Sequence, residues 1–592
     1  MGNKNIVRLG VLALAILVFW WYIRHTRTSK EKNEKVLVTV STNPIKGFDP
    51  AQADDAYTTQ EVSKVYEGLL AYHYLKRPVE LVPNLAVAMP TISEDNCVYT
   101  FTIREDVQFH DDACFADGKG RALVAEDVVY TLKRVADPKA RSPWFSVLAG
   151  KIKGLDAWRN KYIEAAQADY TESIVGLKAL DQHTVQFTLN QPWHQFMHIL
   201  AINFCYVVPQ EAVQYYGAEF MNHPVGTGPF TLQEFNPQLN KLVYHKNPTF
   251  RDKFYPSEAT EAYQHLLEDA GKKLPLVDKV ITHILPEEQP RWLKFRQGSV
   301  DIVDTSRDNI ALEIVQGAGL APQWREKGMQ LFLEPEQNTS FCAFNNSHVL
   351  FKDNVKLKQA MSLALDRQQY NQLFHNDNAV LAQSIIPPGL PGYRKDYTNP
   401  YHSHDLTKAK TLLAEAGYPG GQGLPEITLD TSSNTNQRQK AEFFKKCMER
   451  IGVKIKVTAN LFPELLKKVS QKKTMMHAMS WSADYPDAES FLSLFYRSDQ
   501  HVGIGANFSN GTYNHLYEQA ANASQAPERT ALYEQLNEMV AEYAPIICTI
   551  HTPHSVVYHG WIKNYLWTDY HHGIEQYLNI DLSCKKALKA KL

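Results

Sequence analysis

A single apolar run close to the start of the sequence sets the first limit on how this chain can fold. Residues 9–23 read LGVLALAILVFWWYI and follow Lys4 and Arg8, a charged segment before an apolar one. These residues span roughly 22 Å as a helix, and the run lengthens to residues 6–23 if Arg8 reaches the interface, against a hydrocarbon core of about 30 Å. No other stretch of the sequence comes near 18 apolar residues. The remaining residues are therefore expected to fold on one side of a membrane.

We interpret this run as an uncleaved signal anchor, with residues 1–35 as anchor and linker. Trp20, Trp21 and Tyr22 fit the aromatic belt of a membrane interface. A cleaved signal peptide, which would release a soluble periplasmic protein, is the alternative. The A-x-A sequence at residues 13–15 lies inside the apolar run, where cleavage is not expected.

The composition is that of an ordinary globular protein. A chain of 592 residues has room for two to four domains at ~100–200 residues each. Hydrophobic residues make up 44% and charged residues 21%, which excludes a disordered chain or a coiled coil. Lys and Arg number 62 against 64 Asp and Glu, so the basic excess typical of nucleic-acid-binding proteins is missing. We therefore expect no nucleic-acid partner.

The seven cysteines show no metal or redox motif. No two of them lie within three residues of each other, so there is no C-x-x-C sequence. A local disulfide between Cys97 and Cys114 and a set of buried reduced thiols are both compatible with the sequence.

Strand and helix patterns alternate along the chain. β-branched alternation predicts strands, and apolar residues at helical spacing predict helices. This alternation places the chain in the α/β or α+β class, with several layers. The predicted strands cover residues 36–43, 96–104, 184–189, 242–245, 279–285 and 453–457, and the predicted helices cover residues 58–70, 124–135, 356–374, 405–416, 439–451 and 527–542.

Histidine pairs raise the possibility of a metal-dependent hydrolase. His194 and His198 are four residues apart on an expected helix, a spacing that can hold a metal. The glutamate of an H-E-x-x-H motif is missing, because Gln195 follows His194, and spacing reveals no third ligand. Solvated or core histidines account for the pattern better. The sequence contains no G-x-S-x-G serine, phosphate-binding loop or G-x-G-x-x-G motif. Further histidine pairs are His551 with His554 and His571 with His572.

Six short motifs follow one another in order along the chain. They are YTFTIREDVQF at 99–109, AEDVVY at 125–130, HPVGTGPF at 223–230, FNN at 344–346 with FKDNV at 351–355 and QAMSLALDR at 359–367, AKTLLAEAGYPG at 409–420, and WSADYPD at 481–487 with FL at 491–492. Together these motifs resemble the family 5 extracellular solute-binding proteins, the oligopeptide- and dipeptide-binding class of ABC importers. The resemblance extends over about residues 36–570, nearly all of the chain after the apolar run.

The resemblance implies an α/β periplasmic-binding-protein fold with two lobes and a ligand cleft between them. Lobe I would be discontinuous, and an added subdomain would pack on it. No cofactor or enzyme activity is implied. The implied division is residues 36–70, 180–337 and 545–592 for lobe I, residues 71–179 for the subdomain, and residues 338–544 for lobe II.

The resemblance also implies an anchor for the ligand. Relatives that take peptides use an aspartate in the W-x-x-D stretch to pair with the ligand's ammonium group, and Asp484 has that position here. A charged donor in a water-poor cleft needs a charged acceptor. Trp481, Ser482 and Ala483 would offer backbone groups to an extended ligand, as an added strand does. The alternative role for Asp484 is to cap a turn before Pro486.

Further cleft positions follow from the same resemblance. Trp144 corresponds to an aromatic position that lines the cleft of relatives. Asp55, Ala56 and Tyr57 correspond to a segment that pairs with the ligand backbone. An ordinary loop or core position is the alternative for each. Two aromatic residues, Phe341 and Phe462, are candidates for pocket walls, and plain core packing is the better single interpretation of each.

Two departures from the family pattern bear on the ligand. Some oligopeptide-binding relatives carry an arginine three residues before the motif tryptophan, where this chain has Ala478 beside His477. A ligand carboxylate of fixed length therefore has no obvious partner, which leaves longer, modified or non-peptide ligands open. The stretch 111–121 (DDACFADGKGR) is longer than usual and is either a surface insertion or a lid edge.

These features predict the substrate-binding component of an ABC importer. It would capture peptides by closing two lobes and deliver them to an inner-membrane permease, acting as a monomer at the periplasmic face of a Gram-negative-type inner membrane. A non-peptide solute (a metal chelate, a sugar or an opine) is the alternative ligand. A tethered sensor without transport is a third hypothesis.

Overall fold

The structure is a computed structural model that describes residues 33–236, 239–304, 315–316, 319–498, 504–523, 526–567, 569–570 and 572–592. The predicted membrane anchor at residues 6–23 lies outside these residues. Within the described residues, no helix has both the length and the apolar character needed to cross a membrane.

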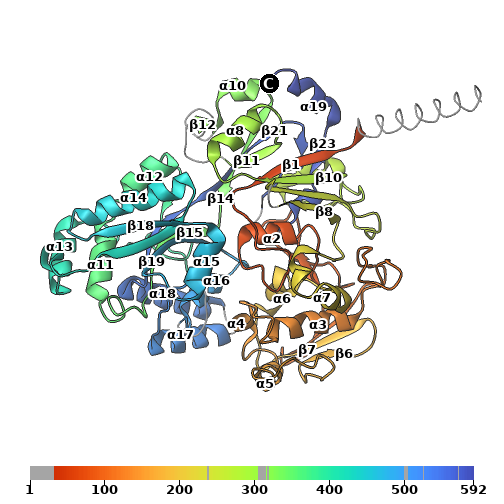
Figure 1. Ribbon diagram of the computed structural model, residues 1–592, viewed down its shortest axis with the longest axis horizontal. Helices are drawn as coiled ribbons and strands as arrows, with labels where there is room; N and C mark the ends of the chain where they lie inside the picture. Colours follow the sequence, from red (N-terminus) through yellow and green to blue (C-terminus); the bar gives the residue numbers. More distant parts are fainter. Residues whose placement is uncertain are drawn as a thin grey trace, which may run out of the picture.

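Lobe I contains a four-stranded sheet in the order β1-β10-β9-β8. The first strand runs parallel to β10, with Val36 opposite Lys279, and the other neighbours are antiparallel. Figure 1 shows this sheet above the short helix α2, Ala56–Val62. The strands are β1 (Val36–Ser41), β8 (Phe230–Asn236), β9 (Lys241–Lys246) and β10 (Lys279–Ile284).

The helix predicted over residues 58–70 is wrong in its second half, because α2 ends at Val62. The carbonyls of Lys64 and Val65 accept hydrogen bonds from the N–H groups of Phe230 (3.1 Å) and Gly228 (2.8 Å). These carbonyls are thus satisfied by a distant segment, and the chain turns away from the helix axis.

A second four-stranded sheet, in the order β4-β5-β7-β6, forms the subdomain below lobe I. Helix α3 (Ala125–Ala136) packs on β6 and β7. Since β7 pairs with both β5 and β6, the subdomain continues past residue 179, and the predicted end at 71–179 is wrong by one strand. The strands are β4 (Thr91–Ile92), β5 (Val98–Thr102), β6 (Leu177–Ala179) and β7 (Thr184–Thr188), with helices α4 (Phe145–Leu148) and α5 (Leu155–Lys161) beside them.

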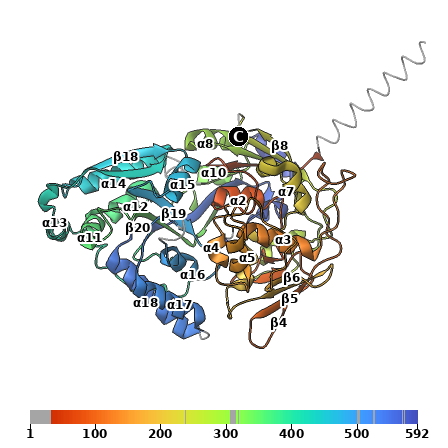
Figure 2. The ribbon, with the colours of Figure 1, turned by 60° about the horizontal axis from the view of Figure 1, so that its bottom comes forward.

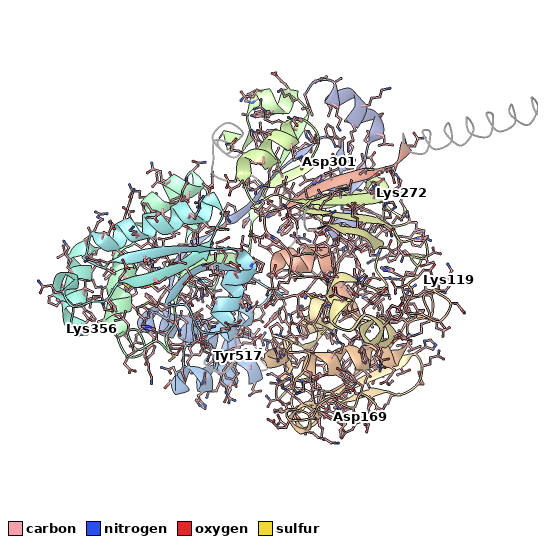
Figure 3. All side chains as sticks on the ribbon, viewed as in Figure 1. Lys119, Asp169, Lys272, Asp301, Lys356 and Tyr517 are labelled. Carbon is pink, nitrogen blue, oxygen red and sulfur yellow. The ribbon has the colours of Figure 1, made fainter. Side chains whose placement is uncertain are left out.

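A three-stranded sheet, β11-β21-β14, completes lobe I. Asp301, labelled in Figure 3, holds it to both ends of the described chain: it accepts from Val38 N (2.7 Å) and Trp561 Nε1 (2.8 Å) and pairs with Lys585 (3.0 Å). The strands are β11 (Ile302–Asp304), β14 (Met329–Pro335) and β21 (Pro553–His559), and the helices around them are α8 (Glu288–Arg296), α10 (Pro322–Glu326) and α19 (Leu582–Lys589).

Lobe II is built on a six-stranded mixed sheet in the order β16-β20-β15-β19-β17-β18. Strand β20 pairs with β15 inside this sheet, so the predicted return to lobe I at residue 545 is wrong, and the chain leaves lobe II after β20. The strands are β15 (Asn338–Phe344), β16 (Val380–Leu381), β17 (Ile427–Ser432), β18 (Ile455–Asn460), β19 (Met476–Ser482) and β20 (Ile546–His551).

Helices surround this sheet, as Figures 1 and 2 show. The single helix predicted over residues 356–374 is two helices. The first ends at Ala364, where Leu365 has an extended backbone, and Asp366 caps the second by accepting from Gln369 N (2.9 Å). The helices are α11 (Val355–Ala364), α12 (Arg367–His375), α13 (Leu406–Glu415), α14 (Thr435–Glu449), α15 (Phe462–Ser470), α16 (Glu489–Leu492), α17 (Gly511–Asn522) and α18 (Ala526–Tyr543).

Short elements connect these layers. They are β2 (Leu70–Tyr72), β3 (Leu81–Pro83), α6 (Phe196–Ile199), α7 (Gln210–Tyr216), β12 (Val315–Gln316), β13 (Gly319–Leu320), β22 (Ile562–Lys563) and β23 (Asn579–Ile580).

The chain passes between the lobes at two neighbouring places. Strand β14 pairs with β21 up to Pro335 opposite Pro553, and β15 pairs with β20 from Ser340 opposite Ile550. Glu336, Gln337 and Thr552 therefore form the crossing, which we call the hinge. Two adjacent extended segments without other covalent links allow one lobe to rotate against the other.

The lobes also touch across the cleft. Thr435 Oγ1 donates to Glu287 Oε2 (2.8 Å), and the rings of Tyr57 and Phe462 meet edge to face at 5.7 Å. Both ribbon views draw α15 and α16 on the side of lobe II that faces α2 and α4. The structure is thus a two-lobed α/β fold in a closed arrangement.

Candidate functional site

A cavity of about 1250 Å³ lies between the lobes. Residues of α2, the subdomain, the hinge, β19 and α15 line it together. All of the predicted contact residues except Phe341 are among them: Asp55, Ala56, Tyr57, Trp144, Phe462, Trp481, Ser482, Ala483 and Asp484. A role for any of them in ligand binding stays a prediction.

Phe341 is the exception because of its place in β15. Side chains alternate between the two faces of a strand, and Asn338 and Ser340 take the cavity face. Phe341 is buried in the hydrophobic core. The prediction that it forms a pocket wall is wrong, and the alternative of core packing describes it.

Asp484 follows β19 and lies at the cavity wall without a counter-ion. Its N–H donates to Ser490 Oγ (3.0 Å), and the Ser490 hydroxyl donates to Oδ2 (3.4 Å). No lysine, arginine or histidine of the described residues forms an ion pair with it. Burial, with a smaller contribution from Glu489, raises the pKa of Asp484 to about 7. The neighbouring Asp487, rather than Asp484, accepts the N–H of Glu489 (2.9 Å), so the predicted capping alternative belongs to Asp487.

The strand before Asp484 offers a free edge. On one side β19 pairs with β15 along its whole length, from Met476 to Ser482. On the other side β17 pairs only with Met476 and His477. The edge from Ala478 to Ser482 therefore has no strand partner among the described residues, and it borders the cavity. An extended ligand can add to such an edge as one more strand.

The segment at Asp55 begins helix α2. Asp55 is the N-cap, has an extended backbone, and accepts from Thr58 N (2.9 Å) and Thr58 Oγ1 (2.8 Å). Ala56 and Tyr57 form the first helical turn, where backbone N–H groups have no partner within the helix, and all three residues border the cavity. Pairing of this segment with the backbone of a ligand stays a prediction.

Aromatic side chains form the walls. Trp144 stacks on Phe204 with ring centroids 4.9 Å apart and donates from Nε1 to Ala53 O (2.9 Å). Tyr57 and Phe462 meet from opposite lobes. These contacts hold the rings rigidly, which favours enclosure of apolar ligand groups.

The position where some relatives carry an arginine holds no cation. Ala478 borders the cavity, whereas His477 is buried on the other face of β19 and lies 2.7 Å from Ile504 O through Nε2. Burial lowers the pKa of His477 to about 4, so its ring is neutral at pH 7.

Among the polar cavity residues that sequence reasoning missed are four from the region of the hinge. Glu336 lies at the hinge, Asn338 begins β15, Asp304 ends β11, and Asp569 comes from the C-terminal segment. Because they come from three distant segments, no spacing in the sequence could have grouped them.

The histidine pair proposed as a metal site does not converge. Helix α6 begins at Phe196, so His194 is not on it. His194 Nε2 lies 3.8 Å from Asp487 Oδ2, and His198 Nδ1 lies 2.9 Å from the Tyr72 hydroxyl. Across the residues that the structure describes, no group of three or more His, Cys, Asp or Glu could hold a metal ion.

Two peripheral predictions are also resolved. All seven cysteines are free, so Cys97 and Cys114 form no disulfide. None of residues 111–121 borders the cavity, and Lys119 lies at the edge of the molecule away from lobe II (Figure 3). The stretch is therefore a surface insertion and not a lid edge.

Comparisons with known proteins agree with this architecture. The family model described as bacterial extracellular solute-binding proteins, family 5, matches residues 80–502. The chain belongs to this family. Among curated family 5 relatives, the dipeptide-binding protein of Escherichia coli (strain K12) is 27% identical over 571 residues, with 93% of this chain and 94% of the relative covered. Heme-binding protein A of Haemophilus influenzae is 26% identical over 575 residues, with 93% of both chains covered.

Solved structures share the fold of this family 5 protein. A periplasmic binding protein, DppA, from Helicobacter pylori in complex with the peptide STSA has a TM-score of 0.76 at 23% identity, covering 93% of this chain and 99% of that one. OppA of Listeria monocytogenes bound to peptide has a TM-score of 0.75 at 19% identity, with the same coverage.

Proposed function

We propose that this protein is the substrate-binding component of an ABC importer, that it captures peptides in its interlobe cavity, and that it delivers them to an inner-membrane permease. The proposal rests on one observation: an unpaired carboxylate, Asp484, lies at the end of a free strand edge inside a cavity closed by two lobes. The carboxylate suits a peptide's terminal ammonium, and the edge suits its backbone. The names of relatives as dipeptide-, di/tripeptide- and glutathione-binding proteins support the same class of ligand.

Closure of the two lobes would couple peptide binding to transport. A ligand shifts the lobes toward the closed form only if it contacts both of them. Asp484 and β19 belong to lobe II, whereas Tyr57 and Trp144 come from the other side of the cleft. The closed form would then dock on the permease, as a signal that the cavity is occupied.

The remaining features of the proposal follow from its role. The protein acts as a monomer, carries out no chemistry, and works at the periplasmic face of the inner membrane of a Gram-negative-type bacterium, anchored by residues 6–23. Binding through backbone groups makes selectivity for ligand side chains broad, because every peptide offers the same backbone.

Native mass spectrometry of the full chain, purified in a mild detergent, tests the proposal. We expect a series of co-purified peptides that are released by acid and are missing from the Asp484→Asn variant. The Asp405→Asn variant is the matched control, because Asp405 caps α13 away from the cavity and asparagine caps equally well. A single non-peptide mass would overturn peptide capture, and peptides retained by Asp484→Asn would remove the proposed anchor.

A further inference from the structure

A second acidic region occupies the cavity at the hinge, apart from Asp484. Glu336 lies at the crossing between β14 and β15, and its Oε1 accepts from Ser482 Oγ (3.2 Å). Asp304 and Asp569 also border the cavity. Both carboxylates lie close enough to Glu336 to disfavour its ionised form. Burial first, then Asp569 and Asp304, raise the pKa of Glu336 to about 8.

Two buried hydrogen-bonding groups of the same region have no partner among the residues that the structure describes. Asn338 is only 8% exposed and donates from Nδ2 to Ser482 Oγ (2.9 Å), which connects it to Glu336, yet its Oδ1 accepts no hydrogen bond. The Tyr570 hydroxyl, beside Asp569, is likewise without a partner at 8% exposure. A buried polar atom without a partner costs about 1–3 kcal/mol, so a ligand atom that supplied the missing bond would be favoured.

No lysine, arginine or histidine of the described residues forms an ion pair with Glu336, Asp304 or Asp569. The charge of Arg77 acts to lower the pKa of Asp569, but its guanidinium donates its hydrogen bonds to the carbonyls of Tyr74 (3.2 Å) and Trp567 (2.9 Å). The charge of Arg291 likewise acts to lower the pKa of Asp304, and its guanidinium donates to Leu285 O (2.7 Å).

The nearby histidines add no positive charge either. His554 and His572 also border the cavity. Burial lowers the pKa of His554 to about 3 and that of His572 to about 4. The region therefore presents hydrogen-bond acceptors and negative charge at the hinge.

We propose that Glu336, Asn338 Oδ1 and Asp569 form a second subsite for a cationic group of the ligand, an ammonium or guanidinium separate from the one at Asp484. This inference deepens the proposed function and rests on it: the preferred ligands are peptides with a lysine or arginine side chain. Such a group donates several hydrogen bonds and carries the charge that the region lacks. The cationic group would also bind at the hinge that joins the lobes. Occupancy of the subsite would therefore shift the equilibrium between the open and the closed form.

Isothermal titration calorimetry on the full chain in detergent tests this inference with matched peptides. The probes are the three tripeptides of alanine with one lysine, at each position in turn, and their three norleucine counterparts, which keep the four-carbon stem of the side chain and remove its ammonium group. For at least one position we expect the lysine peptide to bind about tenfold or more tightly than its counterpart, as a charge-assisted hydrogen bond gives.

Two variants locate the effect. Glu336→Gln keeps the acceptor for Ser482 and resembles the protonated glutamate, so it should fold; we expect the lysine preference to fall below about threefold while norleucine peptides bind as before. Glu334→Gln is the matched control. Glu334 lies two residues away on β14, accepts from the Tyr263 hydroxyl (3.0 Å) and does not border the cavity. Asn338→Ser, which removes the unpartnered acceptor, should lower the preference several-fold and provides an independent variant if Glu336→Gln does not fold.

The outcomes separate this inference from the proposed function. If tripeptides bind but wild type shows no lysine preference, or Glu336→Gln retains it, or Glu334→Gln loses it equally, the subsite is overturned and peptide capture stands. If no tripeptide binds, peptide capture fails, and 1,5-diaminopentane is compared with pentylamine. A diamine preference that Glu336→Gln abolishes supports the cation subsite alone, whereas no preference overturns it as well.

Discussion

Glu67 in lobe I and Asp484 in the cavity are both buried carboxylates, and they differ in what surrounds them. Glu67 accepts from both terminal guanidinium nitrogens of Arg251, Nη1 at 2.5 Å and Nη2 at 2.9 Å, and lies 3.6 Å from Lys253. Burial acts to raise its pKa, but Arg251 and Lys253 outweigh burial and bring the pKa below its usual value. Asp484 has the burial without the cations, and its pKa is raised to about 7.

The difference separates a buried carboxylate that stabilises the fold from one that is available to bind a charged ligand. In lobe I the protein supplies both members of the ion pair, and it does so again between lobe I and the subdomain, where Asp49 pairs with Arg134 of α3 at 2.7 Å. At Asp484 and Glu336 the residues that the structure describes supply a carboxyl group and no ion-pair partner. An uncompensated buried charge is unfavourable in the empty protein, and a ligand that brings the cation relieves it. Buried carboxylates without a protein cation are therefore where the ligand's charges are expected.

The largest predicted effect is on stability, at the paired carboxylate. Glu67→Gln leaves the buried guanidinium of Arg251 with neutral side-chain acceptors only, the new amide oxygen and Asn84 Oδ1 (2.7 Å). We expect the free energy of unfolding to fall by about 3–5 kcal/mol in urea denaturation, because a buried charge loses its partner. Because the native pKa of Glu67 is lowered, the wild-type contribution is present above the usual pKa and is lost as the pH falls through the native value. Exposed Glu94→Gln serves as the control. A Glu67→Gln variant as stable as wild type would contradict a structural role for the Glu67–Arg251 ion pair.

The second-largest predicted effect is at the unpaired carboxylate, Asp484. Its substitution should change the affinity for peptide and leave the stability of the protein nearly unchanged. Asp484→Asn should weaken peptide binding by about 10–100-fold, the equivalent of a charge-assisted hydrogen bond of about 1.5–3 kcal/mol. The unfolding free energy of the ligand-free protein should stay unchanged or rise at pH 8, since the variant removes an unfavourable charge. Calorimetry and urea denaturation of the same sample measure both. A large loss of stability would mean that Asp484 is structural after all.

The pH dependence of binding sharpens the comparison. An ammonium needs ionised Asp484, whose pKa is about 7 without ligand, so the affinity for a norleucine tripeptide should fall as the pH decreases from 7 to 5.5, by at most about tenfold per unit. The Glu489 carboxyl beside it, with a pKa also raised to about 7 by burial, contributes to the same range. Affinity measured across this range should lose most of its slope in Asp484→Asn. A profile that is flat in wild type would contradict the assignment.

The smallest predicted effect concerns contact between the lobes. Phe462→Ala removes the edge-to-face contact with Tyr57, worth about 0.5–1.5 kcal/mol, and should weaken peptide binding by about 2–12-fold through loss of the closed form. Small-angle scattering with saturating peptide reports the closure. Leu461→Ala, at a neighbouring side chain that is 55% exposed, is the control. Equal effects of the two variants would exclude a specific role for the ring pair.

Much of the site could be predicted from the sequence because it comes from one continuous motif. Residues 481–484 border the cavity together, since a strand and the turn after it keep neighbouring residues close in space. Phe341 was misplaced because its aromatic character is equally suited to a wall or a core. Only the register of β15, with Asn338 and Ser340 on the cavity face, decides between them.

By itself the sequence determined the alternation of strands and helices, the family, and the motif that carries Asp484, because these depend on local periodicity and on residues adjacent in the chain. The tertiary structure decided the rest. It ended α2 by offering distant hydrogen-bond donors to Lys64 and Val65, placed β20 in lobe II, and brought Glu336, Asp304 and Asp569 to one region. Long-range pairing and the shared burial of charges depend on which segments meet, and no local pattern carries that information.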